Sequence, residues 1–300
     1  MPELPEVETV VRQLAPALTG QRLHEASLYD PLLGEPDVGS LHGRSVTRVF
    51  RLGKLVVVEL GARAKPSAGR RARSAGPGDP MWLAVHLRMT GRLIWQPAGE
   101  ARNETAPRPA NLRARLVFDH GCVAFLDTRR FGTLTVHRDL QPIEPRALDP
   151  TSPAFTEAAL AELLGNTTQN IKAWLLRQDR LVGLGNIYAC EILFEAGIDP
   201  RRAAGTLTRA EVARLHHCAR DVLGRAIDAC GTTFSDFQDS HGLTGSYQQY
   251  LRVYGREGQP CATCGSHVKR LVQQQRSTFY CPGCQRRTRR AHKQGRGRRR

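Results

Sequence analysis

The spacing of four cysteines near the end of the chain constrains its fold more than any other feature. Cys261, Cys264, Cys281 and Cys284 form two Cys-x-x-Cys pairs separated by 16 residues. Two tight turns with this spacing can bring four thiolates to the corners of a tetrahedron, the geometry of structural zinc. Residues 267–280 can form two strands, but so small a hairpin buries too little surface to fold without a metal. We therefore expect one structural Zn²⁺, rather than four free thiols, and no redox or nucleotide cofactor.

The charge balance favours a polyanionic partner. The chain has 44 Lys and Arg against 28 Asp and Glu, which gives a formal net charge of +16. Such an excess is typical of nucleic-acid-binding proteins, although ribosomal and membrane-surface proteins share it. No apolar run approaches the roughly 20 residues of a membrane helix, and the N-terminus lacks the order of a signal peptide. We expect a cytoplasmic protein with no membrane partner.

The first half of the chain has the pattern of a helix followed by strands. Apolar residues recur at helical spacing over residues 4–18, with Pro5 acceptable in the first turn. Short β-branched runs then follow, punctuated by Gly and Asp, and predict an antiparallel β-sandwich. These runs are 46–50, 55–60, 82–87, 116–118 and 133–136. Residues 64–80 and 97–109 are rich in Gly, Pro, Ala and Arg without periodicity, and we expect exposed loops there.

The second half is helical and then cysteine-bracketed. Four prolines within residues 142–153 indicate a linker, and Thr208 with Glu211 forms the capping box of a long helix. Residues 286–300 contain nine Lys or Arg and no acid. The sequence thus predicts an α+β multidomain protein. Its parts are a β-sandwich domain (1–141), a helical domain (151–238), a zinc finger (246–286) and a basic tail expected to be disordered (287–300).

The N-terminus offers a nucleophile. Removal of Met1 would expose the secondary amine of Pro2 beside the carboxylate of Glu3. An α-amino group has a pKa of about 8, far below that of lysine, so part of it is neutral at pH 7. Attack on a sugar carbon would give a charged iminium that promotes elimination, with Glu3 moving the protons. The alternative is that Pro2 only begins the chain and Glu3 only favours the helix dipole, and these residues alone favour that alternative.

A glycine-rich turn offers a phosphate site. Gly183 and Gly185 precede Asn186, which can cap a helix running to about residue 196. The free N–H groups of a helix N-terminus bind phosphate, and Lys172 can add a charge. An ordinary turn between helices is the alternative. Arg276 on the cysteine-bracketed hairpin can likewise contact phosphate or be a solvated surface cation.

Several motifs together closely resemble the formamidopyrimidine-DNA glycosylases, a family of bacterial repair enzymes. They are MPELPE at the N-terminus, HLRMTGRL (86–93), TRRFG (128–132), GLGNIY (183–188) and the terminal finger, in order over nearly the whole chain. The resemblance implies a catalytic β-sandwich, a helix-two-turns-helix domain and a zinc-finger β-hairpin. It further implies a monomeric base-excision repair enzyme, acting on bacterial nucleoid DNA, whose partner is double-stranded DNA with an oxidised base. Such an enzyme excises 8-oxoguanine and formamidopyrimidines through an N-terminal proline Schiff base and cleaves the strand by β,δ-elimination.

The resemblance also assigns residues. Pro2 matches the nucleophile, Glu3 its acid/base partner, and Lys54 a lysine that contacts phosphate beside the lesion. The residues that match DNA contacts fall into two groups. Lys172, Asn186 and Arg276 match residues that hold the bent backbone. Met89, Arg129 and Phe131, with the adjacent Arg130, match a wedge that fills the gap left by the flipped nucleotide.

The sequence departs from the family pattern at several places. Thr128 replaces the usual proline, a His-Asp-His-like segment is replaced near Asn111 to Arg113, and residues 240–245 match the loop over the flipped base only loosely. These departures put local DNA contacts and lesion preference in doubt. An endonuclease VIII-like enzyme for oxidised pyrimidines is therefore a second hypothesis. A noncatalytic DNA-binding protein is a third, which the presence of Pro2, Glu3 and Lys54 disfavours.

Overall fold

The computed structural model describes residues 1–63, 79–99, 109–165, 167–232, 240–243 and 245–286. Within these residues the chain forms two compact units. The first contains residues 1–155, 177–185 and 219–251, and the second contains residues 156–176, 186–218 and 252–286. Most of the expected loops at 64–80 and 97–109, and the basic tail, lie outside the described residues. The domain boundaries given above remain predictions.

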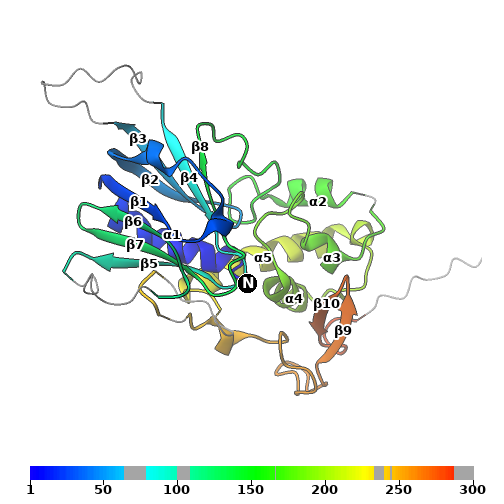
Figure 1. The fold of residues 1–300 in the computed structure, drawn as a ribbon. Coiled ribbons are helices and arrows are strands. Elements are labelled where there is room, and N and C mark those ends of the chain that lie inside the picture. The colour runs from blue at the N-terminus through cyan, green and yellow to red at the C-terminus, as the bar shows by residue number, and fades with distance from the viewer. Residues whose placement is uncertain (64–78, 100–108, 166, 233–239, 244, 287–300) are drawn as a thin grey trace, which may run out of the picture. The chain divides into compact units, whose positions relative to one another are not determined.

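The first unit contains two four-stranded antiparallel sheets (Figure 1). The order of one sheet is β1 (Leu23–Leu28), β6 (Leu112–Phe118), β7 (Gly121–Asp127) and β5 (Gly91–Pro97). The order of the other is β2 (Arg44–Leu52), β3 (Leu55–Arg63), β4 (Met81–His86) and β8 (Thr133–His137). Side chains of both sheets share one apolar core, so the predicted antiparallel β-sandwich is confirmed.

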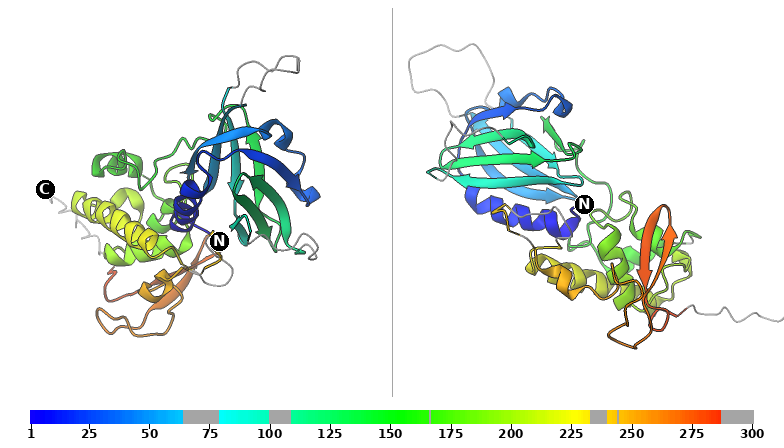
Figure 2. Two further views of the ribbon diagram at one scale, coloured as in Figure 1. Left: turned by 90° about the vertical axis from the view of Figure 1, so that its left-hand side faces the viewer. Right: turned by 60° about the horizontal axis from the view of Figure 1, so that its bottom comes forward.

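Helix α1 (Leu4–Leu18) has the predicted bounds and completes this core. Its apolar face, from Val7 to Leu18, is buried with the side chains of both sheets, and α1 packs against β2, β3 and β5 (Figure 2). Pro5 lies in the first turn, where its missing N–H costs no hydrogen bond. The short helices of this unit are η1 (Pro31–Leu33), η2 (Val38–Leu41) and η4 (Tyr247–Tyr250).

Two connections cross from one sheet to the other next to each other. Residues 87–90 join β4 to β5, and residues 128–132 join β7 to β8. In one sheet His86 pairs with Thr133, and in the other Gly91 pairs with Asp127. The strand residues that flank one loop are therefore paired with the strand residues that flank the other.

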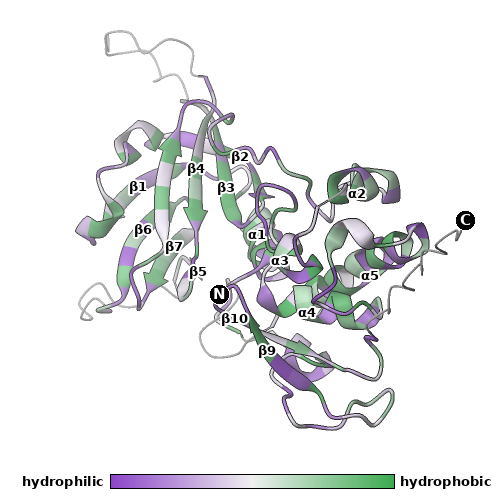
Figure 3. Cartoon of the chain, turned by 90° about the vertical axis from the view of Figure 1, so that its right-hand side faces the viewer, coloured by the Kyte–Doolittle hydropathy of each residue, from purple (hydrophilic) through white to green (hydrophobic). Residues whose placement is uncertain are grey.

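The second unit is helical, with the cysteine-rich hairpin packed on it. Its helices are α2 (Glu157–Leu164), α3 (Ile171–Leu175), α4 (Asn186–Glu195), η3 (Ala204–Thr206) and the first half of α5 (Arg209–Asp228), whose second half belongs to the first unit. The predicted capping box of α5 is present, since Thr208 N and Glu211 N bond to each other's side chains. The hairpin strands are β9 (Lys269–Gln273) and β10 (Arg276–Tyr280), which packs against α4. Strand β9 is strongly hydrophilic in Figure 3, because it carries the exposed Lys269 and Arg270.

A buried carboxyl group joins α4 to the start of the zinc module. Glu191 is 2% exposed and accepts hydrogen bonds from the backbone N–H groups of Arg252, Val253 and Tyr254. Burial raises the pKa of Glu191, and the three N–H donors oppose that rise. Among the described residues, no helix is long and apolar enough to cross a membrane.

Candidate active site and nucleic-acid interface

Pro2 and Glu3 lie immediately before α1, and Glu3 is held there by contacts with the first turn of the helix. Pro2 is buried, and Glu3, 3% exposed, is the N-cap residue of the helix. The Glu3 side chain accepts from the backbone of Glu6, while the Glu6 carboxylate accepts from Glu3 N at 2.7 Å. These two reciprocal hydrogen bonds form a capping box, which fixes the backbone of Glu3, the residue after Pro2, at the start of the helix.

The glycine-rich turn at 183–185 packs directly on these residues. Leu4 N donates to Gly183 O at 3.0 Å, and Gly183 has a left-handed φ of 87°. A Cβ at Gly183 would lie 2.8 Å from Leu4 Cβ, and one at Gly185 would lie 2.7 Å from Glu3 Cγ. Both positions require glycine because the N-terminal residues Glu3 and Leu4 approach them too closely for a Cβ. This reason was not predicted from the sequence.

Lys54 reaches the same turn from the hairpin between β2 and β3. Its Nζ donates to Leu184 O at 2.9 Å. Gln178 holds the turn from the other side, since Gly183 N donates to its Oε1 at 3.0 Å and its Nε2 donates to Leu184 O at 2.9 Å. Glu3 and Lys54 thus contact neighbouring residues of one turn.

Glu6 and Arg51 hold the segments that carry Glu3 and Lys54, a role that was not predicted from the sequence. Glu6 is 2% exposed, and its Oε1 accepts from Thr232 N at 2.8 Å. Arg51 donates to Gly53 O beside Lys54, and also to Glu8 at 2.9 Å and Asp149 at 2.7 Å. The position of Glu6, three residues after Glu3, is the one signal in the sequence for its capping role.

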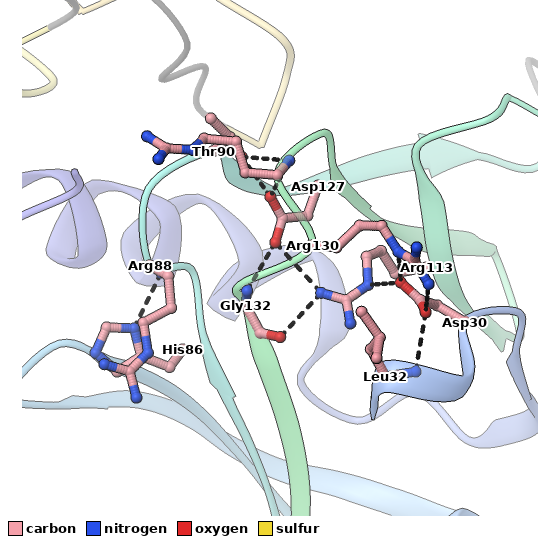
Figure 4. Close-up of polar contacts among 10 residues, drawn as sticks. Asp30, Leu32, His86, Arg88, Thr90, Arg113, Asp127, Arg130 and Gly132 are labelled. Atoms are coloured by element: carbon pink, nitrogen blue, oxygen red, sulfur yellow. Dashed lines mark hydrogen bonds and ion pairs between the residues drawn. The ribbon is translucent and has the colours of Figure 1, made fainter. Parts of the chain in front are cut away.

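The residues matched to the wedge lie on the two crossing loops and are exposed. Met89 is 38% exposed and Phe131 is 54% exposed. The guanidinium of Arg129 lies over the Phe131 ring, 5.0 Å from its centroid. Arg130 is also exposed, but its guanidinium makes a bidentate pair with Asp30 at 2.6 and 2.9 Å (Figure 4).

Arg113 occupies the segment where the sequence departs from the family pattern. Its side chain is 1% exposed and lies between Asp30 and Asp127. The guanidinium of Arg113 is therefore internal, and it bonds to these carboxylates rather than facing solvent.

His86 lies at the base of the first crossing loop and is paired across the sheet with Leu55, the residue after Lys54. Its Nδ1 accepts from Arg88 N at 3.0 Å, which requires an unprotonated nitrogen (Figure 4). Burial, with the nearby charges of Arg88 and Lys54, lowers the pKa of His86 to about 4.

In the second unit, the residues matched to phosphate contacts gather at the start of β10. Lys172 Nζ lies 3.5 Å from Ser277 O, and Asn186 Nδ2 donates to the same oxygen at 2.9 Å. Arg276, adjacent to Ser277, is exposed. The prediction that Asn186 caps α4 is wrong, because Asn186 is the first residue of the helix and its buried Oδ1 has no hydrogen-bond partner. Lys172 is fully buried rather than a surface cation.

The four cysteine sulfurs converge as zinc requires. All four lie within 4.8 Å of one another, with Cys264 and Cys281 3.4 Å apart and Cys261 and Cys284 3.9 Å apart. A tetrahedron with Zn–S bonds of about 2.3 Å has edges of about 3.8 Å, so the set fits the ion. The site holds one structural Zn²⁺, which braces the hairpin that carries Arg276.

Family models match three consecutive parts of the chain. The formamidopyrimidine-DNA glycosylase N-terminal domain matches residues 1–134, and the H2TH domain of the same enzymes matches residues 147–238. The zinc finger found in Fpg and isoleucyl-tRNA synthetase matches residues 258–287.

Whole-length relatives agree. Formamidopyrimidine-DNA glycosylase from Laribacter hongkongensis is 39% identical, covering 95% of this chain and 100% of that protein. The crystal structure of the MutM (Fpg) protein from Thermus thermophilus is 36% identical, with a TM-score of 0.78 over 95% of this chain and 98% of the other. A MutM complex with DNA containing carbocyclic 8-oxo-G is 30% identical, with a TM-score of 0.79 over 95% and 100% of the two chains.

Proposed function

The chain belongs to the formamidopyrimidine-DNA glycosylase family, and we propose that Pro2, Glu3 and Lys54 perform its chemistry. The protein is a base-excision repair DNA glycosylase that removes oxidised purines, with the AP lyase activity that the family implies. The observation that carries the assignment of residues is the shared turn. Glu3, which follows Pro2, packs on Gly185, and Lys54 bonds to Leu184, so both side chains contact adjacent residues of one turn.

The proposed reaction begins with the nitrogen of Pro2. While Met1 is attached this nitrogen is an amide without nucleophilicity, so removal of Met1 must precede catalysis. The freed secondary amine attacks C1′ of the damaged nucleotide, and the bond from C1′ to the base breaks with a proton delivered to the departing base. Opening of the sugar then breaks the C1′–O4′ bond and leaves an iminium between Pro2 and C1′.

The iminium is the electron sink for strand cleavage. It acidifies the protons at C2′, and removal of one expels the 3′ phosphate by β-elimination, after which δ-elimination expels the 5′ phosphate. Glu3 is positioned to accept and return these protons, since its carboxyl group is fixed by the capping box next to Pro2. Lys54 supplies a positive charge that we assign to the phosphate beside the lesion.

Access to C1′ requires that the nucleotide leave the duplex. Extrusion costs a few kcal/mol, which insertion of apolar side chains into the stack can offset. Met89 and Phe131 are exposed apolar side chains on adjacent loops, and Arg129, whose guanidinium lies over the Phe131 ring, can bond to the unpaired base. We assign these three to the wedge, with Arg130 beside them.

The second unit supplies the proposed grip on the DNA backbone. Asn186 and Lys172 both direct nitrogen atoms to Ser277 O, next to Arg276. The exposed Arg276 can bind a non-ester phosphate oxygen without reading base sequence, and Asn186 and the buried Lys172 hold the adjacent Ser277 in place. We expect the enzyme to act as a monomer in the cytoplasm, on nucleoid DNA.

Borohydride trapping tests the chemistry. The protein is incubated with duplex DNA carrying one 8-oxoguanine opposite cytosine, reduced, and the adduct is mapped by mass spectrometry. A crosslink on the peptide that begins at Pro2 is the expected result, because only an iminium is trapped. Pro2→Gly should weaken the lyase step, and unchanged elimination in that variant would contradict the assignment.

The same experiment separates the competing functions. A duplex with an oxidised pyrimidine is run in parallel, because one related structure is a Lactococcus lactis Fpg complex with DNA containing such a base. Faster trapping on that duplex would favour the endonuclease VIII-like function. Binding without a crosslink on either duplex would favour the noncatalytic one.

A further inference from the structure

Thr90 connects the two crossing loops at their closest point. It follows Met89 in the first loop and is 7% exposed. Its hydroxyl accepts from Arg129 N in the second loop at 3.0 Å and donates to the Asp127 carboxylate (Figure 4). The Thr90 hydroxyl therefore connects the backbone of the second loop to the first loop, at the residue next to Met89.

Asp127, which accepts from Thr90 in the first loop, also accepts hydrogen bonds from the second loop. It is 0% exposed, and its Oδ2 accepts from Gly132 N at 2.7 Å while Oδ1 accepts from Arg129 N at 3.2 Å. Gly132 and Arg129 lie at the two sides of Phe131, so one carboxylate fixes the backbone around that ring. A buried carboxylate that accepts several bonds is stable as an anion only with a compensating cation.

Arg113 is that cation. Its Nη1 lies 3.3 Å from Asp127 Oδ2 and donates to Gly132 O at 2.9 Å, while its Nε lies 2.5 Å from Asp30. Asp30 is held in turn by Arg130. Hydrogen bonding by Arg130, with contributions from Leu32 N and Arg113, keeps the pKa of Asp30 well below its usual range despite burial.

Both loops also have a strained backbone beside the wedge side chains. Arg88 has a φ of 54° and Arg130 a φ of 60°, in the left-handed region that non-glycine residues rarely occupy. Such conformations persist only where surrounding contacts hold them. Here those contacts are the bond from Arg88 N to His86 and the pair between Arg130 and Asp30.

We propose that Thr90, Asp127 and Arg113 form a loop clasp that presents Met89, Arg129 and Phe131 to DNA as one preformed wedge. This inference rests on the proposed wedge function. The three clasp residues are buried and do not contact DNA themselves, so they are positioning residues. Because the clasp orders both loops before DNA binds, base extrusion does not carry the free-energy cost of ordering them.

Thr90→Val tests the clasp, because it removes the hydroxyl and keeps the shape of the side chain. We expect excision of 8-oxoguanine from duplex DNA to slow by about tenfold, because loops that are not fixed in advance must be ordered while the base is extruded. Thr90→Ser, which keeps the hydroxyl, should restore most of the rate. Strand cleavage at an abasic nucleotide in single-stranded DNA should stay near the native rate, because no base has to be extruded.

A second measurement reads insertion directly. Fluorescence of 2-aminopurine placed next to the lesion should rise on binding of the native protein, and rise less and more slowly with Thr90→Val. A native excision rate and native fluorescence in Thr90→Val would overturn the clasp. Equal loss of duplex excision and single-strand cleavage would also overturn it, because that result indicates a general structural role.

Met89→Ala and Phe131→Ala separate failure of the clasp from failure of the wedge. If these variants slow duplex excision while Thr90→Val does not, the wedge stands and the clasp is wrong. If all three excise at the native rate, the wedge assignment fails and the clasp fails with it. If the native protein itself excises neither lesion, the proposed function is at fault.

Discussion

The Glu3 side chain lies against Gly185, so closely that a Cβ on residue 185 would be 2.7 Å from Glu3 Cγ and nearer still to the carboxyl group. Any side chain at this position must displace Glu3 or the turn that Lys54 contacts. Gly185 is thus part of the geometry of the proposed reaction centre although it has no functional group.

Gly185→Ala should therefore reduce base excision strongly. A displacement of about 1 Å at a reacting group can cost roughly 100-fold in rate. Single-turnover kinetics on a duplex with 8-oxoguanine measures the effect. Gly224→Ala is the matched control, because a Cβ there meets nothing within 4 Å, and it should leave the rate unchanged.

Replacing Arg51 should destabilise the protein. Arg51 is 6% exposed and pairs with Glu8 and Asp149, and its loss leaves the part-buried Asp149 without this cation, while Glu8 keeps its pair with Arg12. Although burial opposes it, Arg51 lowers the pKa of Asp149. We expect Arg51→Met to cost about 3 kcal/mol in the free energy of unfolding, measured with urea. Arg138→Met, which breaks an exposed pair with Asp37, should cost less than about 1 kcal/mol.

Stability should fall as the pH is lowered from about 6.5 toward 4, partly because of His86. Its pKa is about 4 in the folded protein, below the ordinary value of 6.5, so the unfolded chain binds more protons in this interval. Each pH unit then costs up to about 1.4 kcal/mol. Melting temperatures of the native protein and His86→Gln at pH 7 and pH 5 test this. An identical loss in both would show that other groups account for it.

Removal of zinc should abolish tight DNA binding. Without the ion the four cysteine side chains take up protons and are no longer held together, and the hairpin that carries Arg276 and Ser277 loses its brace. Binding to a duplex with an uncleavable abasic analogue, followed by fluorescence anisotropy, should weaken at least tenfold after chelation, about 1.4 kcal/mol. Added Zn²⁺ should restore it. Full binding by metal-free protein would contradict a bracing role.

The sequence predicts those features that depend on local pattern. The bounds of α1 follow from apolar residues at helical spacing, and the cysteine cluster follows from the spacing of its ligands. The contacts that build the site join distant segments. Glu6 with Thr232, Lys54 with Leu184 and Arg113 with Asp30 are pairs that no periodicity reveals. The burial of Lys172 is of the same kind, since it depends on a hairpin about a hundred residues later.

The position of Pro2 has a practical consequence. Met1 is exposed while Pro2 behind it is buried, so residues added before Met1 can extend into solvent. If Pro2 is the nucleophile, as proposed, an affinity tag before it would keep its nitrogen as an amide and make the purified protein chemically inert. Such material would suit crystallisation with uncleaved lesion-containing DNA, whereas any preparation meant for assays should carry its tag at the other end.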